Sequence, residues 1–477
     1  RVNSSGLVET VELLGSEEVT NVDFTQTPLG TGWTVTDSDA DNYVVFDGST
    51  ARLKFLNTSP VTTFRTTDVI LTSGKTYKLT VDIAVATSGG VKIDGSGISE
   101  TFSTIGVNTR IITPTVNTSV QFYRATANVD LTFNSVSVKE YTANNLARVD
   151  YDGTASSLLA EPERTNLIPY SEDFSEWNIG NSTIAPNAIV SPDGTQNADT
   201  ITVPDSNEFI YESITTTEST EYVFSFYVKR GTIAESALKL AVYDDTANAF
   251  IVVDVSYSAS DSEWTRVTQS FTTPVGCILI RAYAFRNSSS TLGTFSIWGG
   301  QVEEGSYATS YIPTDGGTVT RVKDQYSKTG ISNLINSEEG VLFVEMAYLN
   351  NTGNYKSLSI SDGTTDNRVT FENRPVLNQI KAFVNVSGTN VMSSTQTLTD
   401  VKEFNKMALK WKQNDFAWWV NGVEIYTDTS GNTFSEDTLN RLAFDRGDGF
   451  IQLEGKIKQL QVFKTALTDS ELIALTT

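Results

Sequence analysis

Three aspartates near the start of the chain have the spacing of a calcium-binding loop. Asp37, Asp39 and Asp41 hold its first, third and fifth positions, where carboxylate oxygens are the usual Ca²⁺ ligands. The sixth position is Asn42 rather than the glycine of the sharp turn, and the twelfth is Gly48 rather than a bidentate glutamate. Asp37, Asp39 and Asp41 are therefore candidate ligands of a structural calcium ion, with a solvated acidic turn as the alternative.

A second acidic turn lies near the other end of the chain. Asp445 and Asp448 flank Arg446 and Gly447, and their carboxylates are suitable ligands for a hard cation. Solvated turns of this composition are commoner than metal sites. Asp445 and Asp448 complete the set of candidate metal ligands, and we expect no other cofactor.

Aromatic side chains are the residues best suited to sugar chemistry, because their rings stack on the apolar faces of pyranoses. Trp418 and Trp419 are neighbours in the strand-like segment 416–420, so they point to opposite faces of that strand. Trp418 shares the phase of Phe416 and Val420. Trp419 is therefore the outward-facing candidate for contact with a glycan.

Four further residues are weaker candidates for glycan contact. Tyr243, Tyr283 and the nearby Arg281 lie in the middle of the chain, and Tyr426 follows the Trp418–Trp419 pair. Tyrosine rings stack on sugars, and arginine donates hydrogen bonds to their polar groups. The alternative for all four is simple packing between sheets or subunits.

The residue types make catalysis less expected than binding. Histidine is absent, which excludes Ser-His-Asp and Cys-His systems and histidine-containing zinc sites. A glycosidase that uses two carboxylates stays open. The adjacent Glu303 and Glu304 face opposite sides of a strand and cannot act as that pair. We therefore expect a non-enzymatic protein.

The elements that position these residues are predicted to be strands. Thr, Ser, Asn, Val and Gly are abundant, charged residues make up 19% of the chain, and segments with helical periodicity are almost absent. Alternation of apolar and polar residues, as in 77–85 and 222–228, is typical of half-buried strands. The predicted fold class is all-β, with jelly-roll β-sandwiches in series.

A repeat divides the chain. Residues 132–140 align with 294–304 when two residues are allowed to slip, and Trp33 precedes Tyr77 by nearly the interval that separates Trp177 from Tyr222. The repeat predicts two related sandwiches, and the remaining length predicts a third domain. The predicted boundaries are 1–145, a linker at 146–163, 164–315, a linker at 316–332, and 333–477. We further expect residues 1–16 to be able to pair with 146–160.

Two local signals stand out in the third domain. Asn421-Gly422 between alternating segments predicts a tight hairpin, because both positions need φ > 0. Thr468 and Glu471 form a capping box, which predicts one short helix at the C-terminus.

The net charge of −23 disfavours binding to nucleic acid or to an anionic membrane surface. No run of about 18 apolar residues occurs, so we expect no membrane insertion. The single cysteine, Cys277, cannot form an intrachain disulfide.

Two stretches resemble known families. Residues 333–477, with the Trp-Val-Asn-Gly hairpin at 419–422, the strand that begins at Gly455 and the segment 466–471, resemble a laminin-G-like, concanavalin-A-like jelly roll. Residues 160–322 resemble a module of bacteriophage tail and head fibres, through 161–174, Trp264-Thr-Arg-Val267, 298–314 and Val319-Thr-Arg321. The repeats themselves resemble carbohydrate-binding modules.

The resemblance to fibre modules implies a virion protein. It would be a tail or head fibre that binds a bacterial surface glycan, or a protein that supports such a fibre. Its expected partners are a host polysaccharide and other virion proteins, and fibres of this kind are commonly homotrimers. Two alternatives stay open. One is a secreted or cell-surface bacterial protein that binds or degrades polysaccharide, and the other is a purely structural virion component.

Overall fold

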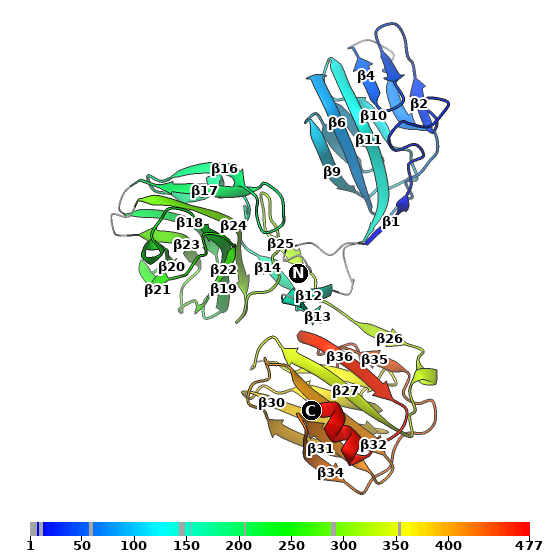
Figure 1. Cartoon of the computed structure of the whole chain (residues 1–477), viewed down its shortest axis with the longest axis vertical. Coiled ribbons are helices and arrows are strands. Elements are labelled where there is room, and N and C mark those ends of the chain that lie inside the picture. The colour runs from blue at the N-terminus through cyan, green and yellow to red at the C-terminus, as the bar shows by residue number, and fades with distance from the viewer. Residues whose placement is uncertain are drawn as a thin grey trace. The chain divides into compact units, whose positions relative to one another are not determined.

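The computed structural model describes residues 7–8, 13–56, 61–142, 148–152, 154–204, 207–287, 292–351 and 354–477. Antiparallel sheets dominate the described residues, which confirms the predicted all-β fold class. The chain divides into two compact units, Val11–Leu146 and the combination of Arg1–Thr10 with Ala147–Thr477. Figure 1 labels many of the strands of both units.

The unit Val11–Leu146 is a sandwich of two sheets. One sheet has the order β3 (Tyr43–Phe46), β4 (Ala51–Phe55), β11 (Val129–Thr142), β6 (Tyr77–Ser88) and β9 (Gly106–Ile112), and β1 (Leu13–Glu17) also pairs with β11. The other has the order β2 (Trp33–Thr36), β5 (Thr63–Thr66), β10 (Gln121–Arg124), β7 (Val91–Gly95) and β8 (Ile98–Phe102). Alternate residues of both sheets meet in one buried core, as the pleat of each strand requires.

The second unit contains a sandwich with the same strand order. One sheet runs β16 (Thr183–Ile189), β17 (Ala198–Val203), β24 (Gly293–Glu304), β19 (Glu221–Arg230) and β22 (Thr265–Thr272). The other runs β15 (Asn178–Ile179), β18 (Glu208–Thr215), β23 (Leu279–Asn287), β20 (Lys239–Asp244) and β21 (Ala249–Ser256). Short 3-10 helices lie at Phe174–Glu176 and Glu235–Ala237. Strand for strand, the two orders match, so the repeat seen in the sequence is a repeat of topology.

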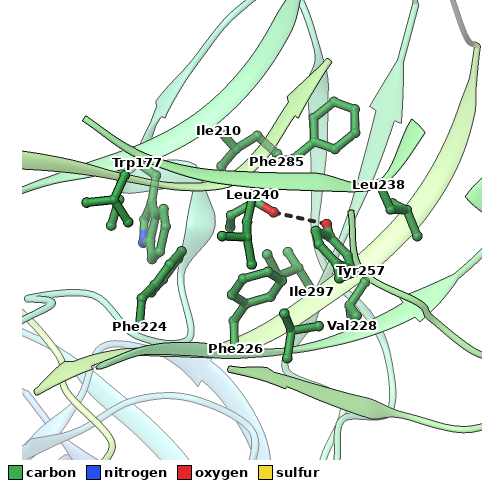
Figure 2. Close-up of a cluster of buried hydrophobic side chains, with 14 of the residues drawn as sticks. Trp177, Ile210, Phe224, Phe226, Val228, Leu238, Leu240, Tyr257, Phe285 and Ile297 are labelled. Atoms are coloured by element: carbon green, nitrogen blue, oxygen red, sulfur yellow. Dashed lines mark hydrogen bonds between the residues drawn. The ribbon is translucent and has the colours of Figure 1, made fainter. Parts of the chain in front are cut away.

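Figure 2 shows how alternation fills the core of this second sandwich. Phe224 and Phe226 of β19 point toward Leu240 and Phe285 of the opposite sheet. Tyr257 brings a hydroxyl group into this cluster, and that hydroxyl donates a 2.9 Å hydrogen bond to the carbonyl of Ala284. This hydrogen bond offsets the cost of removing the buried hydroxyl from water.

The same unit also contains a larger sandwich. Its seven-stranded sheet runs β12 (Arg148–Asp152), β13 (Ala155–Ala160), β36 (Gly455–Phe463), β27 (Glu339–Tyr348), β32 (Asn405–Lys412), β33 (Phe416–Val420) and β34 (Val423–Asp428). Its six-stranded sheet runs β26 (Ser327–Thr329), β35 (Arg441–Ala443), β28 (Lys356–Ser361), β29 (Arg368–Asn373), β30 (Gln379–Val386) and β31 (Thr389–Thr397). A 3-10 helix lies at Ser332–Leu334, α1 spans Asp469–Thr476, and β14 (Arg164–Asn166) pairs with β25 (Val319–Arg321).

Both predicted linkers contain strands, which corrects the predicted boundaries. Residues 146–163 hold β12 and β13, and β13 pairs with β36 through Leu158 and Ile457. Residues 316–332 hold β25 and β26. These strands are short, and the pairings of β13, β25 and β26 with β36, β14 and β35 join segments far apart in the chain, so local alternation does not reveal where they belong. The second sandwich is thus inserted between two strands of the third.

The expected pairing of residues 1–16 with 146–160 stays a prediction, although Val8 and Asp150 do line one pocket. β12 pairs with β13, whereas Leu13 and Leu14 pair with Thr142 and Tyr141 of β11. Val8 donates its backbone N–H to the carbonyl of Pro192 in the second sandwich. Residues 1–6 and 9–12 lie outside the described residues.

The two local predictions for the third domain are confirmed. Asn421 and Gly422 connect β33 to β34 with φ values of 48° and 81°. The Thr468 side chain accepts from the backbone N–H of Glu471, whose carboxylate in turn accepts from the N–H of Thr468, at the start of α1. Among the described residues, no helix has the length and apolar character needed to cross a membrane.

Candidate glycan-binding face

Trp419 is the first predicted glycan contact that the structure corrects. Its side chain faces away from Trp418 and the main core, as alternation predicts. However, Trp419 is only 5% exposed, because Leu472 of α1 packs over this face of the sheet. The ring is therefore unavailable to a glycan, and its role is to anchor the C-terminal helix.

Tyr426 lies on β34 at the edge of the main core, the cluster that contains Trp418. Its ring is half-buried against apolar neighbours, and its hydroxyl donates to Asp428 at 3.4 Å. The structure thus places Tyr426 apart from the other tyrosines of the predicted site.

The acidic turn near the C-terminus is neutralised by arginine. Asp445 accepts hydrogen bonds from both terminal nitrogens of Arg441 and from the backbone N–H of Gly447. Asp448 forms an ion pair with Arg446 at 2.6 Å. Because guanidinium groups occupy these carboxylates, Asp445 and Asp448 do not form a cation site.

The three early aspartates do not converge either. Asp39 accepts from the backbone N–H groups of Asp41 and Asn42 and from the Asn42 side chain. Hydrogen bonding from Asp41 lowers the pKa of Asp39 below its usual value. No group of three or more His, Cys, Asp or Glu side chains suited to a metal occurs in the described part of the chain. Asp37, Asp39 and Asp41 thus form a hydrogen-bonded turn.

The other three candidates do come together. Tyr243 on β20 and Tyr283 on β23 both project from the outer face of the sheet β15–β18–β23–β20–β21, since Val242 and Ala282 beside them belong to the core. Arg281 is opposite Tyr243 in the register and shares that face. Its guanidinium carbon lies 5.6 Å from the ring centroid of Tyr243.

The same face carries further aromatic residues. Tyr211 of β18 lies 5.2 Å from the Arg281 guanidinium and 4.8 Å from the Tyr283 ring. Phe209 continues the row at 5.6 Å from Tyr211. On the other side, Phe250 of β21 lies 4.9 Å from Tyr243. We name this set the aromatic strip: Phe209, Tyr211, Tyr243, Phe250 and Tyr283, with Arg281 and Arg286.

The two arginines of the strip are fixed and partly accessible. Arg281 forms a 2.5 Å ion pair with Asp245, and its side chain is 34% exposed. Arg286 lies over the Phe250 ring at 4.6 Å and pairs with Asp254. A guanidinium stacked on rings and paired on one edge keeps other N–H groups available to a ligand.

The tyrosines of the strip differ in their access to solvent. Burial raises the pKa of the Tyr283 hydroxyl, and Tyr283 is 8% exposed. Tyr211 and Tyr243 are half-buried and so present more ring surface. The strip thus offers partly exposed rings and hydroxyl groups in one row across four strands.

Sequence reasoning missed Phe209, Tyr211, Phe250 and Arg286. A signal for two of them exists, because Phe209 and Tyr211 alternate with Ile210, a core residue, in a strand-like segment. No local signal aligns β18 with β23 and β21, so the extent of the row is visible only in the sheet.

The residues that carry the resemblance to phage fibres have a different role. The Asn166 amide donates to the carbonyl of Ile312, and the Gln301 side-chain oxygen accepts from the N–H of Ile312. Glu303 accepts from the backbone N–H and the hydroxyl of Thr309 at 2.8 and 2.6 Å. These four side chains, which we name the clasp (Asn166, Gln301, Glu303 and Thr309), are buried. They hold the segment 305–314 against the sheet.

A buried charge cluster continues this arrangement. Glu161 pairs with Arg148 of β12 at 3.0 Å and with Arg321 of β25 at 2.9 Å. Asp324 is the second acidic partner of Arg148. Burial acts to raise the pKa of Glu161, but the two arginines hold it below its usual value. The motif residues are thus structural, and they do not line the aromatic strip.

No protein-family model and no curated protein matches this chain. Solved structures similar to it include the CBM40 of the Ruminococcus gnavus IT-sialidase, with 20% identity over 32% of this chain and 98% of that chain and a TM-score of 0.26. They also include the CBM22-1-CBM22-2 tandem domain of Paenibacillus barcinonensis Xyn10C, with 10% identity over 63% of this chain and 100% of that chain and a TM-score of 0.23.

Proposed function

We propose that the chain is a non-enzymatic glycan-binding protein and that the second sandwich binds the glycan on the aromatic strip. The observation that carries this proposal is the row of five aromatic rings interleaved with two arginines on one sheet face. Such a row combines apolar platforms for pyranose faces with N–H donors for hydroxyl or carboxylate groups.

The length of the strip favours an oligosaccharide. It crosses β18, β23, β20 and β21, and neighbouring strands lie about 4.8 Å apart, so the row spans roughly 14 Å. A single pyranose is too short to contact both ends. We therefore expect a surface polysaccharide or its repeating unit as the ligand.

We further propose a bacteriophage fibre as the place where this binding occurs, with other virion proteins as partners. The resemblance of residues 160–322 to fibre modules supports this step. A homotrimer is part of the same proposal, and light scattering of the purified chain tests it.

The decisive experiment compares single ring removals in the two repeats. Tyr243→Ala removes the ring at the centre of the strip, whereas Tyr123→Ala removes a half-buried tyrosine from the topologically equivalent sheet of the first sandwich. On an array of bacterial surface polysaccharides, the unchanged chain and Tyr123→Ala should bind the same glycan, and Tyr243→Ala should bind it about tenfold more weakly, as expected for loss of one stacked ring.

The proposal is wrong if the unchanged chain binds no bacterial polysaccharide, or if both substitutions weaken binding equally. Its non-enzymatic part has its own assay, which incubates the chain with the bound polysaccharide and measures reducing ends. New reducing ends would show a glycosidase.

The second candidate function is a purely structural virion component. It is favoured by the fact that both strip arginines already have an aspartate partner, as in a surface that packs on a neighbouring subunit. Electron microscopy of the particle distinguishes the two, because a packing surface would be covered by density and a binding surface would be open.

A further inference from the structure

We propose a second saccharide site, independent of the aromatic strip, in a pocket beside Tyr355. The pocket has a volume of about 410 Å³, within the range typical of small-ligand sites. Its walls come from the segments before β14, before β28 and before β36, with Lys323 after β25. Its lining includes Glu163, Lys323, Asn354, Tyr355, Ile451 and Gln452.

Ile451 is held in a conformation that costs energy. Its φ is +56°, and a β-branched side chain strongly disfavours this region. The loop around it is closed by two backbone hydrogen bonds, from Arg446 to the carbonyl of Phe450 and from Leu453 to the carbonyl of Phe444. Strained residues that the surroundings hold in place cluster at ligand sites. Ile451, the residue in this strained conformation, is itself part of the pocket lining.

Tyr355 provides an aromatic wall. It is 39% exposed, and the Arg374 guanidinium lies 4.7 Å from its ring centroid. Arg374 is itself fixed by an ion pair with Glu372 at 2.9 Å. The ring is therefore held in place and remains accessible, which is the condition for stacking on a sugar at low entropic cost.

The polar lining favours a neutral ligand. Glu161 is neutralised by two arginines, and Glu454 accepts from the Tyr307 hydroxyl and lies 3.7 Å from Lys356. The remaining charges, Glu163 and Lys323, have opposite signs. Lys323 donates to the Gln452 side chain at 3.3 Å. The amide, ammonium and carboxylate groups around the Tyr355 ring can donate to and accept from the hydroxyl groups of an uncharged pyranose.

Saturation-transfer NMR with the methyl glycosides of glucose, galactose and N-acetylglucosamine tests this site on the full chain. At least one of the three should receive saturation from the unchanged chain. Tyr355→Ala should weaken its binding about tenfold, whereas Tyr123→Ala, in the first sandwich, should leave it unchanged. Circular dichroism of Tyr355→Ala should match that of the unchanged chain, because this position is exposed.

Ile451→Gly adds a readout that simple misfolding would not produce. Glycine accepts φ > 0 without strain, so this variant should raise the melting temperature while it weakens binding of the same glycoside. The proposal is overturned if none of the three glycosides binds, if Tyr355→Ala binds as well as the unchanged chain, or if Tyr243→Ala abolishes the signal. The last result would assign the binding to the strip.

Discussion

The two repeated sandwiches share every step of their strand order but differ in what their outer faces carry. In the first sandwich, the face formed by β5, β10 and β7 presents Arg65, Gln121, Tyr123 and Lys92. In the second, the equivalent strands β18, β23 and β20 present most of the aromatic strip. The inner faces are alike, since Phe64 and Phe122 occupy one core as Ile210 and Phe285 occupy the other.

This difference separates the requirements of the fold from those of binding. A sandwich folds when alternate residues bury an apolar core, and the outward residues between them are free to vary. The first copy uses that freedom for polar groups. The second uses it for rings and arginines, which is why we assign ligand binding to the second copy alone.

The largest expected effects test whether the two cores are equivalent. Trp33 and Trp177 are 7% and 4% exposed, and each donates its indole N–H to a backbone carbonyl upstream, of Asn21 and Tyr170 respectively. Replacing either by alanine should lower the free energy of unfolding by about 3 to 5 kcal/mol, because it leaves a large cavity. Urea unfolding of Trp33→Ala and Trp177→Ala measures both losses. A loss below about 1 kcal/mol in either variant would show that the two cores are not equivalent.

The second prediction concerns the clasp, which the first sandwich lacks. In the second sandwich Glu304 lies opposite Tyr222, and in the first sandwich Glu140 lies opposite the equivalent Tyr77. The residue before each glutamate is therefore equivalent too, so the first sandwich has Lys139 where the second has Glu303. Glu303→Ala should lower the free energy of unfolding by about 3 kcal/mol, since it leaves the N–H and hydroxyl of Thr309 buried without a partner.

The matched control for the clasp is Lys139→Ala. Lys139 is half-buried at the equivalent position, and its loss should change the free energy of unfolding by no more than about 0.5 kcal/mol. Chemical denaturation of both variants makes the comparison. Equal losses would mean that the clasp adds nothing to the second sandwich.

Alternation along single strands predicted much of the fold, including which side of each sheet is buried. It correctly placed Trp418 in the core, and it put Tyr243 and Arg281 in segments whose outward residues share one face. Alternation does not reveal what covers an outward face. Trp419 points outward from its strand as predicted, but a helix about 50 residues later in the chain covers it.

The predicted domain boundaries were wrong for a related reason. β12 and β13 form a local hairpin, but β13 joins the third sandwich only through β36, and these two strands lie about 300 residues apart in the sequence. The motif within residues 160–322 that resembles fibre modules indicated a function in the sequence. Its polar residues prove to be hydrogen-bonded inside the protein, where Asn166 and Glu303 satisfy backbone N–H groups.

The third prediction sharpens the contrast between the outer faces. Arg281→Lys keeps the positive charge near Asp245 but loses the planar guanidinium that lies over Tyr211 and Tyr243. Glycan binding should weaken about threefold to tenfold, because an ammonium group stacks less well and donates in a different geometry. Arg65→Lys, on the equivalent sheet of the first sandwich, is the control and should bind as the unchanged chain does. Calorimetric titration with the polysaccharide found on the array measures both, and an equal loss in both variants would contradict the assignment to the second sandwich.

The smallest expected effect lies in a turn that both sandwiches share. Asp47 connects β3 to β4, and hydrogen bonds from Ser49 and Thr50 lower its pKa to about 2. Asp193 connects the equivalent β16 and β17. Burial acts to raise its pKa, but hydrogen bonds from Ser191 and Thr195 bring it below the usual value. In both turns the folded pKa lies below the unfolded value of about 3.9, so each carboxylate stabilises its turn above that pH and loses the effect as the pH falls through the folded pKa. NMR titration of the two carboxyl groups should give about 2 for Asp47 and a value below 3.8 for Asp193. If Asp193 instead titrates above 3.8, burial outweighs hydrogen bonding in the second sandwich, and the difference between the repeats extends from their outer faces to their turns.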